Sequence, residues 1–284
     1  MFSTALIPLA ENLFAKAEYE NPTGSVKDRA ARYLLEDARQ KGLVTPGSTV
    51  IEATSGNMGI SLAALCRVLG YRCIIVMPDS MSKERQQRIA AEGAEVVLTP
   101  GALGMTGAEE KAHALAQAIP GSFLPRQFEN PANALAHYHT TGPEIWAQSA
   151  GKVDLFLTGV GTGGTLTGTA RFLKEKNPDI RIVAVEPAGS PLLSTGKAGS
   201  HGIQGIGANF IPKVLDRTLL DSVCTVTDAD AFATAKALGE AGFPVGISAG
   251  ANVWAAQRLA EAHPDLCIVT VLPDSADRYT SLGL

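Results

Sequence analysis

The chain has 284 residues, of which 45% are hydrophobic and 18% are charged, and its formal net charge is -4. This composition is typical of a globular protein that is long enough for two linked lobes. The acidic balance argues against nucleic acid as a main partner. Because neither a secretory leader nor a membrane-length apolar run is visible, we expect a cytoplasmic protein without a membrane partner. The four scattered cysteines lack C-x-x-C spacing, which favours reduced thiols over a metal site.

Short β-branched runs alternate with longer helical patterns along the chain. The predicted strands are Thr49–Thr54, Cys73–Met77, Glu95–Thr99, Asp154–Gly159, Ile182–Glu186, Val223–Thr227 and Cys267–Leu272. The predicted helices are Met58–Leu69, Ser82–Ala91, Gly107–Ala118, Thr165–Lys176, Asp228–Ala241 and Ala251–His263. This alternation predicts an α/β fold with parallel sheets that are covered by helices on both faces. Proline, asparagine and aromatic residues interrupt the pattern near Pro125–Ala136, where we expect a lobe boundary.

A lysine stands at the start of a predicted helix in the segment N-P-T-G-S-V-K-D-R, residues 21–29. The positive end of the helix dipole disfavours a cation, so this position shifts Lys27 toward its neutral amine. A neutral amine is a nucleophile that forms a Schiff base with an aldehyde. Lys27 is therefore the candidate catalytic residue.

Two loops that follow strands and open helices have the composition of anion sites. The first, T-S-G-N-M-G at 54–59, would present backbone N–H groups to a carboxylate, although an ordinary helix-capping turn explains it equally well. The second, G-V-G-T-G-G-T at 159–165, would hold a phosphate, with hydroxyls from Thr162 and Thr165. A tight packing turn is the alternative for this second loop. The evidence for a dinucleotide-binding loop is weaker still, since Glu186 is the only candidate for the acidic residue that would bind the ribose.

Two further segments offer neutral polar groups. The segment G-I-S-A-G-A at 246–251 places Ser248 among small residues ahead of a predicted helix. A serine facing a pyridine nitrogen would leave that ring unprotonated, which suits β-elimination and replacement better than transamination. An N-cap serine is the alternative. Gln127, in Q-F-E-N-P at 127–131, could donate to a substrate carboxylate or belong to a polar linker.

Together these segments resemble the cysteine synthase family, the O-acetylserine sulfhydrylases, which are fold type II pyridoxal phosphate enzymes related to the tryptophan synthase β fold. Further matching pieces are T-T-G-P-E-I-W at 140–146, H-G-I-Q-G-I-G-A-N-F-I-P at 201–212 and P-D-S-A-D-R-Y at 273–279. The resemblance implies two lobes, each with a mostly parallel twisted sheet flanked by helices. Residues 21–131 would form a smaller, mobile, substrate-binding lobe, and residues 1–20 and 132–284 a larger lobe that binds the cofactor phosphate.

The resemblance also implies a role for each matching residue. Lys27 would hold pyridoxal 5'-phosphate covalently and move the α-proton, Asn57 would bind the ring hydroxyl oxygen, and Ser248 would face the pyridine nitrogen. The cofactor phosphate would be bound by Gly161, Thr162, Gly163, Gly164 and Thr165. The substrate would be bound by Thr54, Ser55, Gly56, Met58 and Gln127. The implied reaction forms L-cysteine from O-acetyl-L-serine and sulfide through an α-aminoacrylate intermediate.

Several alternatives stay open from the sequence. One is a sister enzyme that uses O-phosphoserine, or serine and homocysteine as a cystathionine β-synthase does. Another is a non-catalytic homologue that binds a partner, and a dehydrogenase would leave the Lys27 segment unexplained. The family also implies a homodimer and a complex with serine acetyltransferase. Met58 stands where the family usually has threonine, so a hydroxyl is lost while the backbone N–H is kept. At a short N-terminus, the family's usual I-G-N-T-P-L becomes Ala5–Leu9, and the stretch after it is abbreviated. We also expect the chain to lack the C-terminal extension of many relatives after Leu284.

Overall fold

The computed structural model describes residues 3–54, 56–81 and 83–284. The chain divides into two compact units, a smaller one of Lys27–Ala132 and a larger one of Met1–Val26 with Asn133–Leu284. The smaller unit thus starts directly at Lys27, whereas the sequence placed residues 21–26 in the smaller lobe. In the described part of the chain, no helix is long and apolar enough to cross a membrane.

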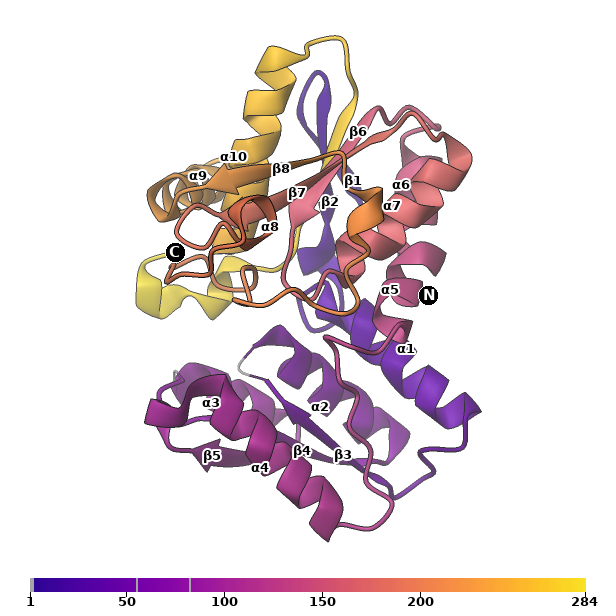
Figure 1. Ribbon diagram of the computed structural model, residues 1–284, viewed down its shortest axis with the longest axis vertical. Helices are drawn as coiled ribbons and strands as arrows, with labels where there is room; N and C mark the ends of the chain where they lie inside the picture. Colours follow the sequence, from indigo (N-terminus) through magenta and orange to yellow (C-terminus); the bar gives the residue numbers. More distant parts are fainter. Residues whose placement is uncertain (1–2, 55, 82) are drawn as a thin grey trace. The chain divides into compact units, whose positions relative to one another are not determined.

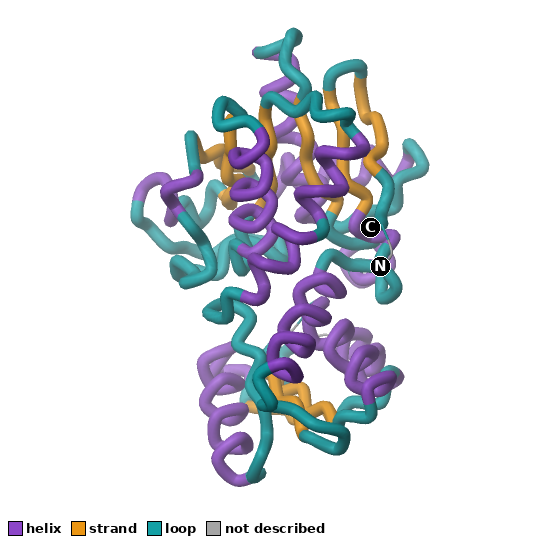
Figure 2. The backbone as a smooth tube through the Cα atoms, turned by 90° about the vertical axis from the view of Figure 1, so that its right-hand side faces the viewer, coloured by secondary structure: helices purple, strands orange, loops and turns teal. Residues whose placement is uncertain are grey.

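The smaller unit is built on a three-stranded parallel sheet in the order β3-β4-β5. Its strands are β3 (Thr49–Ala53), β4 (Arg72–Pro78) and β5 (Glu95–Thr99), and its helices are α1 (Lys27–Gln40), α2 (Asn57–Leu69), α3 (Lys83–Ala91) and α4 (Gly104–Ala118). Successive side chains of a strand point to opposite faces. Ile75 therefore joins the core formed with α1 and α2, while Ile74 and Val76 pack with Ala108 of α4. Both faces of the sheet are covered (Figure 2).

The larger unit contains a six-stranded sheet in the order β1-β2-β9-β6-β7-β8 (Figure 1). The strands are β1 (Leu6–Ala10), β2 (Leu13–Ala17), β6 (Leu155–Gly159), β7 (Arg181–Pro187), β8 (Ser222–Val226) and β9 (Ile268–Leu272). Only the β1–β2 pairing within this sheet is antiparallel among the described residues, and the other neighbours are parallel. The chain order reverses between β9 and β6. Open α/β sheets bind ligands beyond the carboxyl ends of the strands at such a reversal.

Helices cover both faces of this larger sheet. They are α5 (Ala132–His139), α6 (Thr141–Gln148), α7 (Gly164–Lys176), α8 (Leu192–Thr195), α9 (Asp228–Glu240) and α10 (Ile247–Ala262). Leu155 and Leu157 of β6 pack with residues of α10, whereas Phe156 between them packs with α6 and α7. Short 3-10 turns lie at Glu18–Glu20, Gly101–Leu103, Arg217–Leu219, Ala276–Arg278 and Thr280–Leu282.

The parallel α/β architecture and each predicted strand are confirmed, with ends that move by one residue at most. Strands β1 and β2 and helices α6 and α8 had not been predicted. Helix α10 begins at Ile247 instead of Ala251, which corrects the sequence boundary. The reason is Gly250: a Cβ atom there would lie 2.1 Å from the Ala231 carbonyl oxygen of α9. This glycine permits a close helix–helix contact and does not mark a loop.

Candidate functional site

In the smaller unit, the first turns of α1 and α2 lie side by side. Lys27 is the first residue of α1, as expected, and it is partly buried. The next residue, Asp28, accepts a 2.5 Å hydrogen bond from Ser61 Oγ. Ser61 lies one turn after Asn57, the first residue of α2. The structure therefore brings the helix ends that carry Lys27 and Asn57 together.

The loop between β3 and α2 places a glycine, which has no side chain to cap the helix, at the N-cap position. The N-cap is Gly56, whose backbone is extended, and its N–H donates to Thr54 Oγ1 at 3.3 Å. The N-cap is thus a glycine and not the serine, threonine or asparagine of the capping alternative. The first N–H groups of a helix with a glycine N-cap suit an anion such as a carboxylate. Ser55 lies outside the described residues.

Met58 faces the protein interior. Its side chain is 1% exposed and belongs to the hydrophobic core between the sheet and the helices α1 and α2. Any contact of this residue with a substrate must therefore come from its backbone N–H.

Gln127 is held by an acidic residue that the sequence interpretation did not select. Glu52 of β3 is buried, and its two carboxylate oxygens accept the N–H groups of Arg126 at 3.1 Å and Gln127 at 3.4 Å. Burial raises the pKa of Glu52 to about 7, and the two N–H donors act in the opposite direction. The available signal was a single acid inside the apolar strand T-V-I-E-A.

In the larger unit, the loop Gly161–Thr165 leaves β6 and opens α7. Glycine is required along it, because a Cβ atom at Gly161 would lie 2.3 Å from the Gly205 carbonyl oxygen. A Cβ atom at Gly164 would lie 2.1 Å from Asn133 Oδ1, and Gly163 has a φ of +82°. The loop therefore keeps its backbone open at the N-terminus of a 13-residue helix.

Two side chains of helix α5, one turn apart, form hydrogen bonds with this loop. Asn133 Nδ2 donates to Thr162 Oγ1 at 2.9 Å. His137 is buried, with Nε2 3.3 Å from Thr165 Oγ1 and Nδ1 2.8 Å from Thr141 Oγ1. The sequence interpretation missed both supports, although their i, i+4 spacing on one helix was a usable signal.

Ser248 lies in the first turn of α10 and is buried, and the N-cap of that helix is Gly246. The N-cap alternative for Ser248 is therefore wrong. A Cβ atom placed at Gly205 would lie 3.7 Å from Ser248 Oγ. Because Gly205 also contacts Gly161, the structure brings Ser248 close to the glycine loop.

The contacts of Glu186 do not support the dinucleotide alternative, in which this residue would bind a ribose. It is buried at the end of β7 and accepts hydrogen bonds from the N–H groups of Leu193 at 2.7 Å and Ser194 at 3.0 Å. Its carboxylate thus holds the start of α8.

The residues of the larger unit fit the phosphate and ring of pyridoxal phosphate. The glycine loop leaves space that Cβ atoms would fill. Backbone N–H groups at the N-terminus of α7 and the threonine hydroxyls can donate hydrogen bonds to a phosphate dianion in that space. Gly161, Thr162, Gly163, Gly164 and Thr165 would hold the phosphate. Ser248 supplies a neutral hydroxyl for a ring nitrogen.

Comparisons with known proteins agree with this fit. The family described as "Pyridoxal-phosphate dependent enzyme" matches residues 3–274. Cysteine synthase B of Campylobacter jejuni is 50% identical over 273 residues, which cover 96% of this chain and 91% of that protein. The solved cysteine synthase of Entamoeba histolytica has a TM-score of 0.95 and 39% identity, covering 99% of this chain and 87% of that one.

A further solved relative is the O-acetylserine dependent cystathionine β-synthase of Helicobacter pylori. Its TM-score is 0.90 at 42% identity, and the match covers 98% of this chain and 94% of that one. These extensive matches include enzymes of fold type II, and the α/β sheets described above agree with that fold. The chain belongs to the family of pyridoxal-phosphate dependent enzymes.

Proposed function

We propose that this protein forms L-cysteine from O-acetyl-L-serine and sulfide by a β-replacement reaction. The observation that carries the proposal is a phosphate-type loop close to a buried neutral hydroxyl, Ser248, in one unit. A neutral partner for the ring nitrogen limits electron withdrawal and so favours β-replacement over transamination. The identity with cysteine synthases supports the same choice.

Lys27 and Ser248 have complementary roles in this proposal. Bound pyridoxal phosphate withdraws electrons from the α-carbon of a substrate amino acid, which eases loss of the α-proton and of the β-acetate. Lys27 Nζ holds the cofactor and, as a neutral amine, accepts the α-proton. Its place at the N-terminus of α1 disfavours the ammonium form. Ser248 Oγ orients the ring, and Asn57 donates to the ring oxygen.

The smaller unit supplies the groups that bind the substrate carboxylate. Gly56, Asn57 and Met58 would contribute the backbone at the start of α2, where Thr54 Oγ1 accepts the Gly56 N–H. Thr54 and Gln127 would contribute polar side chains. Ser55 is proposed for the same role on its sequence position alone. Glu52 fixes the backbone at Gln127, so its side-chain amide starts from a defined position.

The test uses purified protein loaded with pyridoxal phosphate. We expect O-acetylserine to change the absorbance of the bound cofactor, sulfide to restore it, and mass spectrometry to detect L-cysteine. Lys27→Ala should abolish turnover, because the variant loses the amine that accepts the α-proton. The variant should still bind the cofactor noncovalently through the glycine loop.

Lys83 provides a matched control, since it is also the first residue of a helix in the smaller unit and is exposed. Lys83→Ala should retain wild-type turnover. Cysteine formation by Lys27→Ala, or an unchanged spectrum with every acylated or phosphorylated serine, would contradict the proposed reaction. The amino acids tested include O-phosphoserine, so the spectra also distinguish an enzyme that uses O-phosphoserine from one that uses O-acetylserine.

A second candidate function keeps O-acetylserine and replaces sulfide by homocysteine. The Helicobacter pylori relative, whose name gives that activity, favours it. Supplying homocysteine in the same assay and comparing cystathionine with cysteine formation distinguishes the two thiols. A protein that binds partners without turnover would give neither product.

We further propose a cytoplasmic homodimer that forms a complex with serine acetyltransferase, as the family resemblance implies. Light scattering coupled to gel filtration measures the mass of the assembly. Adding a purified serine acetyltransferase should shift the elution to a larger species, and unchanged elution would argue against that partner.

A further inference from the structure

The two central strands of the larger sheet separate toward their carboxyl ends. The backbone pairing of β6 with β9 covers Leu155 with Ile268 and Phe156 with Val269. Beyond these pairs, Thr270 Oγ1 donates to the Leu157 carbonyl oxygen at 3.0 Å. The separation coincides with the reversal of chain order, and β6 continues from there into the glycine loop.

The side-chain amide of Asn252 spans the gap between these strands. Asn252 is fully buried in α10. Its Oδ1 accepts the Gly159 N–H of β6 at 2.7 Å, and its Nδ2 donates to the Val271 carbonyl oxygen of β9 at 2.8 Å. Nδ2 also lies 3.4 Å from Thr158 Oγ1. The position needs an acceptor toward β6 and a donor toward β9, and an amide supplies both.

The same helix carries Ser248 one turn earlier. Residues four apart lie on one face of a helix, so Ser248 and Asn252 both face the carboxyl end of the sheet. Gly159 is the last residue of β6, two positions before the loop Gly161–Thr165. The Asn252–Gly159 hydrogen bond therefore ties the helix of Ser248 directly to the strand that leads into the loop.

We propose that Asn252 is a positioning residue that sets the separation between Ser248 and the glycine loop, so that one cofactor contacts both. The inference rests on the cofactor roles given to Ser248 and Gly161–Thr165 under the proposed function. Removing the amide leaves the partly buried Gly159 N–H and the buried Val271 carbonyl without this partner, and the strands and α10 are then free to shift. A ligand that touches both the loop and Ser248 is sensitive to this shift, whereas a ligand that touches the loop alone is not.

The test compares two ligands on full-length protein freed of cofactor, with no substrate present. Pyridoxal phosphate reports on the combined site, and inorganic phosphate, measured by competition during reconstitution, reports on the loop. We expect Asn252→Ala to weaken pyridoxal phosphate binding by about tenfold, the effect of one unsatisfied buried group. Binding of inorganic phosphate should change by less than about twofold.

Asn252→Asp keeps the shape and the acceptor toward Gly159 but loses the donor toward Val271. It provides a second variant if Asn252→Ala folds poorly, and we expect a smaller selective loss. Asn12 provides the matched control, because its amide donates to the carbonyl oxygens of His263, Pro264 and Leu266 at 3.4, 3.3 and 3.2 Å. The Asn12 carbonyl accepts the N–H of Ile268, the first residue of β9, so this amide lies at the amino end of the sheet.

Asn12→Ala should leave both affinities unchanged. The proposal is overturned if the two ligands lose affinity equally in the Asn252 variants, if phosphate loses more, or if neither changes. A selective loss in Asn12→Ala would overturn it as well. Failure of the proposed reaction would appear separately, as absent cysteine formation by a wild-type protein whose cofactor affinity still depends on Asn252.

Discussion

At the scale of single residues, the burial of Met58 changes what a threonine at this position would do. Met58→Thr would restore the family's usual side chain, whose hydroxyl would tighten substrate binding if it contacts the substrate. Because the Met58 side chain lies in the core, the substitution also opens a cavity and buries a hydroxyl. We expect the free energy of unfolding to fall by about 2 kcal/mol, measured by hydrogen exchange over residues 57–69.

Met58→Leu is the control for packing, since a volume-conserving exchange should lower stability by less than about 1.5 kcal/mol. Measured in parallel, the O-acetylserine KM separates the two effects of threonine. A lower KM despite lost stability would support a contact of the hydroxyl with substrate. Equal stability of Met58→Thr and wild type would contradict the packing argument.

Glu52 gives the smaller unit a dependence on pH. Its carboxyl pKa rises from 4.5 to about 7, chiefly through burial, so the folded protein binds this proton more tightly than the unfolded chain. The stabilisation from the bound proton is complete below pH 4.5 and is lost as the pH rises through about 7. Glu52→Gln carries no such proton. Its stability relative to wild type should rise by about 3 kcal/mol between pH 4.5 and pH 8.

Hydrogen exchange over residues 49–53 and 125–130, corrected for intrinsic rates, measures this difference at each pH. Glu95→Gln is the control in the same sheet, because the Glu95 side chain is 51% exposed and pairs with Arg72 at its surface. Its stability should follow the wild-type pH dependence. A Glu52→Gln curve parallel to wild type would refute the assignment of the titration to Glu52.

Residues could be predicted from the sequence where the chemistry is local. Lys27 and Ser248 stand near glycines and small residues at the starts of helices, a local pattern that the sequence displays directly. Glu52 and Asn252 could not be found in this way. Their partners are 74 and 93 residues away along the chain, so only the folded structure reveals the hydrogen bonds.

At the scale of elements, strands with continuous apolar runs were predictable because both faces are buried. Strand β1 was missed because it contains Pro8, and β2 because Lys16 interrupts its apolar pattern. Proline is tolerated at an edge strand such as β1. The start of α10 was missed because its first turn contains the glycine that α9 requires. In each case the residue suits the position of its element in the fold, although the local sequence pattern indicates a different structure.

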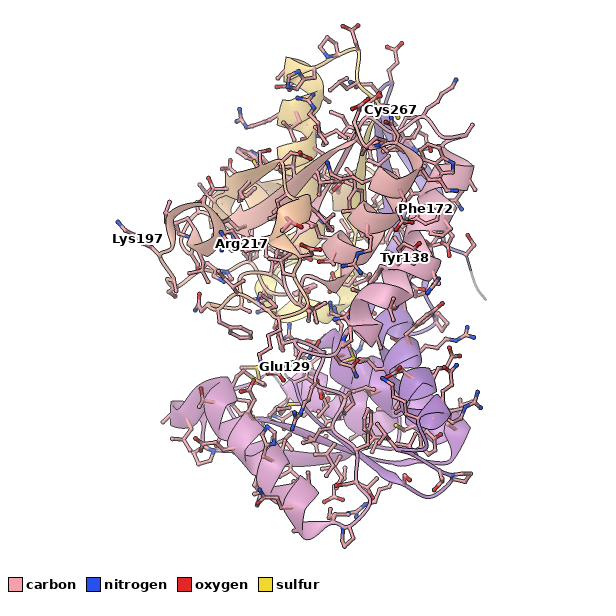
Figure 3. All side chains as sticks on the ribbon, turned by 45° about the vertical axis from the view of Figure 1, so that its right-hand side comes forward. Glu129, Tyr138, Phe172, Lys197, Arg217 and Cys267 are labelled. Atoms are coloured by element: carbon pink, nitrogen blue, oxygen red, sulfur yellow. The ribbon has the colours of Figure 1, made fainter. Side chains whose placement is uncertain are left out.

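The crossing of α5 and α7 gives a prediction at this scale. A Cβ atom at Gly168 of α7 would lie 2.0 Å from the Ala134 carbonyl oxygen and 2.7 Å from the Tyr138 amide nitrogen of α5. Beside this contact, the rings of Tyr138 and Phe172 pack edge to face, with centroids 5.9 Å apart (Figure 3). Gly168→Ala should push α5 away, withdraw Asn133 from Thr162, and lower cofactor affinity by about tenfold.

Gly239→Ala is the matched control, since it lies within helix α9 and a Cβ atom there meets nothing within 4 Å. It should raise stability by up to about 1 kcal/mol and leave cofactor binding unchanged, because alanine is the better helix former. Equilibrium titration of pyridoxal phosphate measures both variants. Wild-type affinity in Gly168→Ala would show that α5 does not support the loop.

At the scale of the whole molecule, the larger unit is assembled from both ends of the chain. Its strand β2 lies between β1 and β9 and pairs in parallel with β9. The two paired strands are separated by some 250 residues of sequence, so no local pattern predicts the pairing. The smaller unit is inserted between the two segments, and the chain enters it at Lys27 and leaves it at Ala132.

Lys16 fastens the N-terminal segment to the rest of the larger unit. The side chain is fully buried, and Nζ pairs with Glu144 Oε2 at 2.8 Å and donates to Gln148 Oε1 at 2.9 Å and to the Thr4 carbonyl oxygen. Removing one partner of a buried ion pair leaves the other charge uncompensated. Lys16→Ala should therefore lower the free energy of unfolding by about 3–5 kcal/mol.

Urea unfolding followed by tryptophan fluorescence tests the role of Lys16, because Trp146 and Trp254 both lie in the larger unit. Replacing both charges, as in Lys16→Met with Glu144→Leu, should recover most of the lost stability, since apolar side chains of similar volume can substitute for a buried pair. A loss in Lys16→Ala below about 1 kcal/mol, the range of exposed pairs, would mean that β2 is held by its pairing with β9 and not by this lysine.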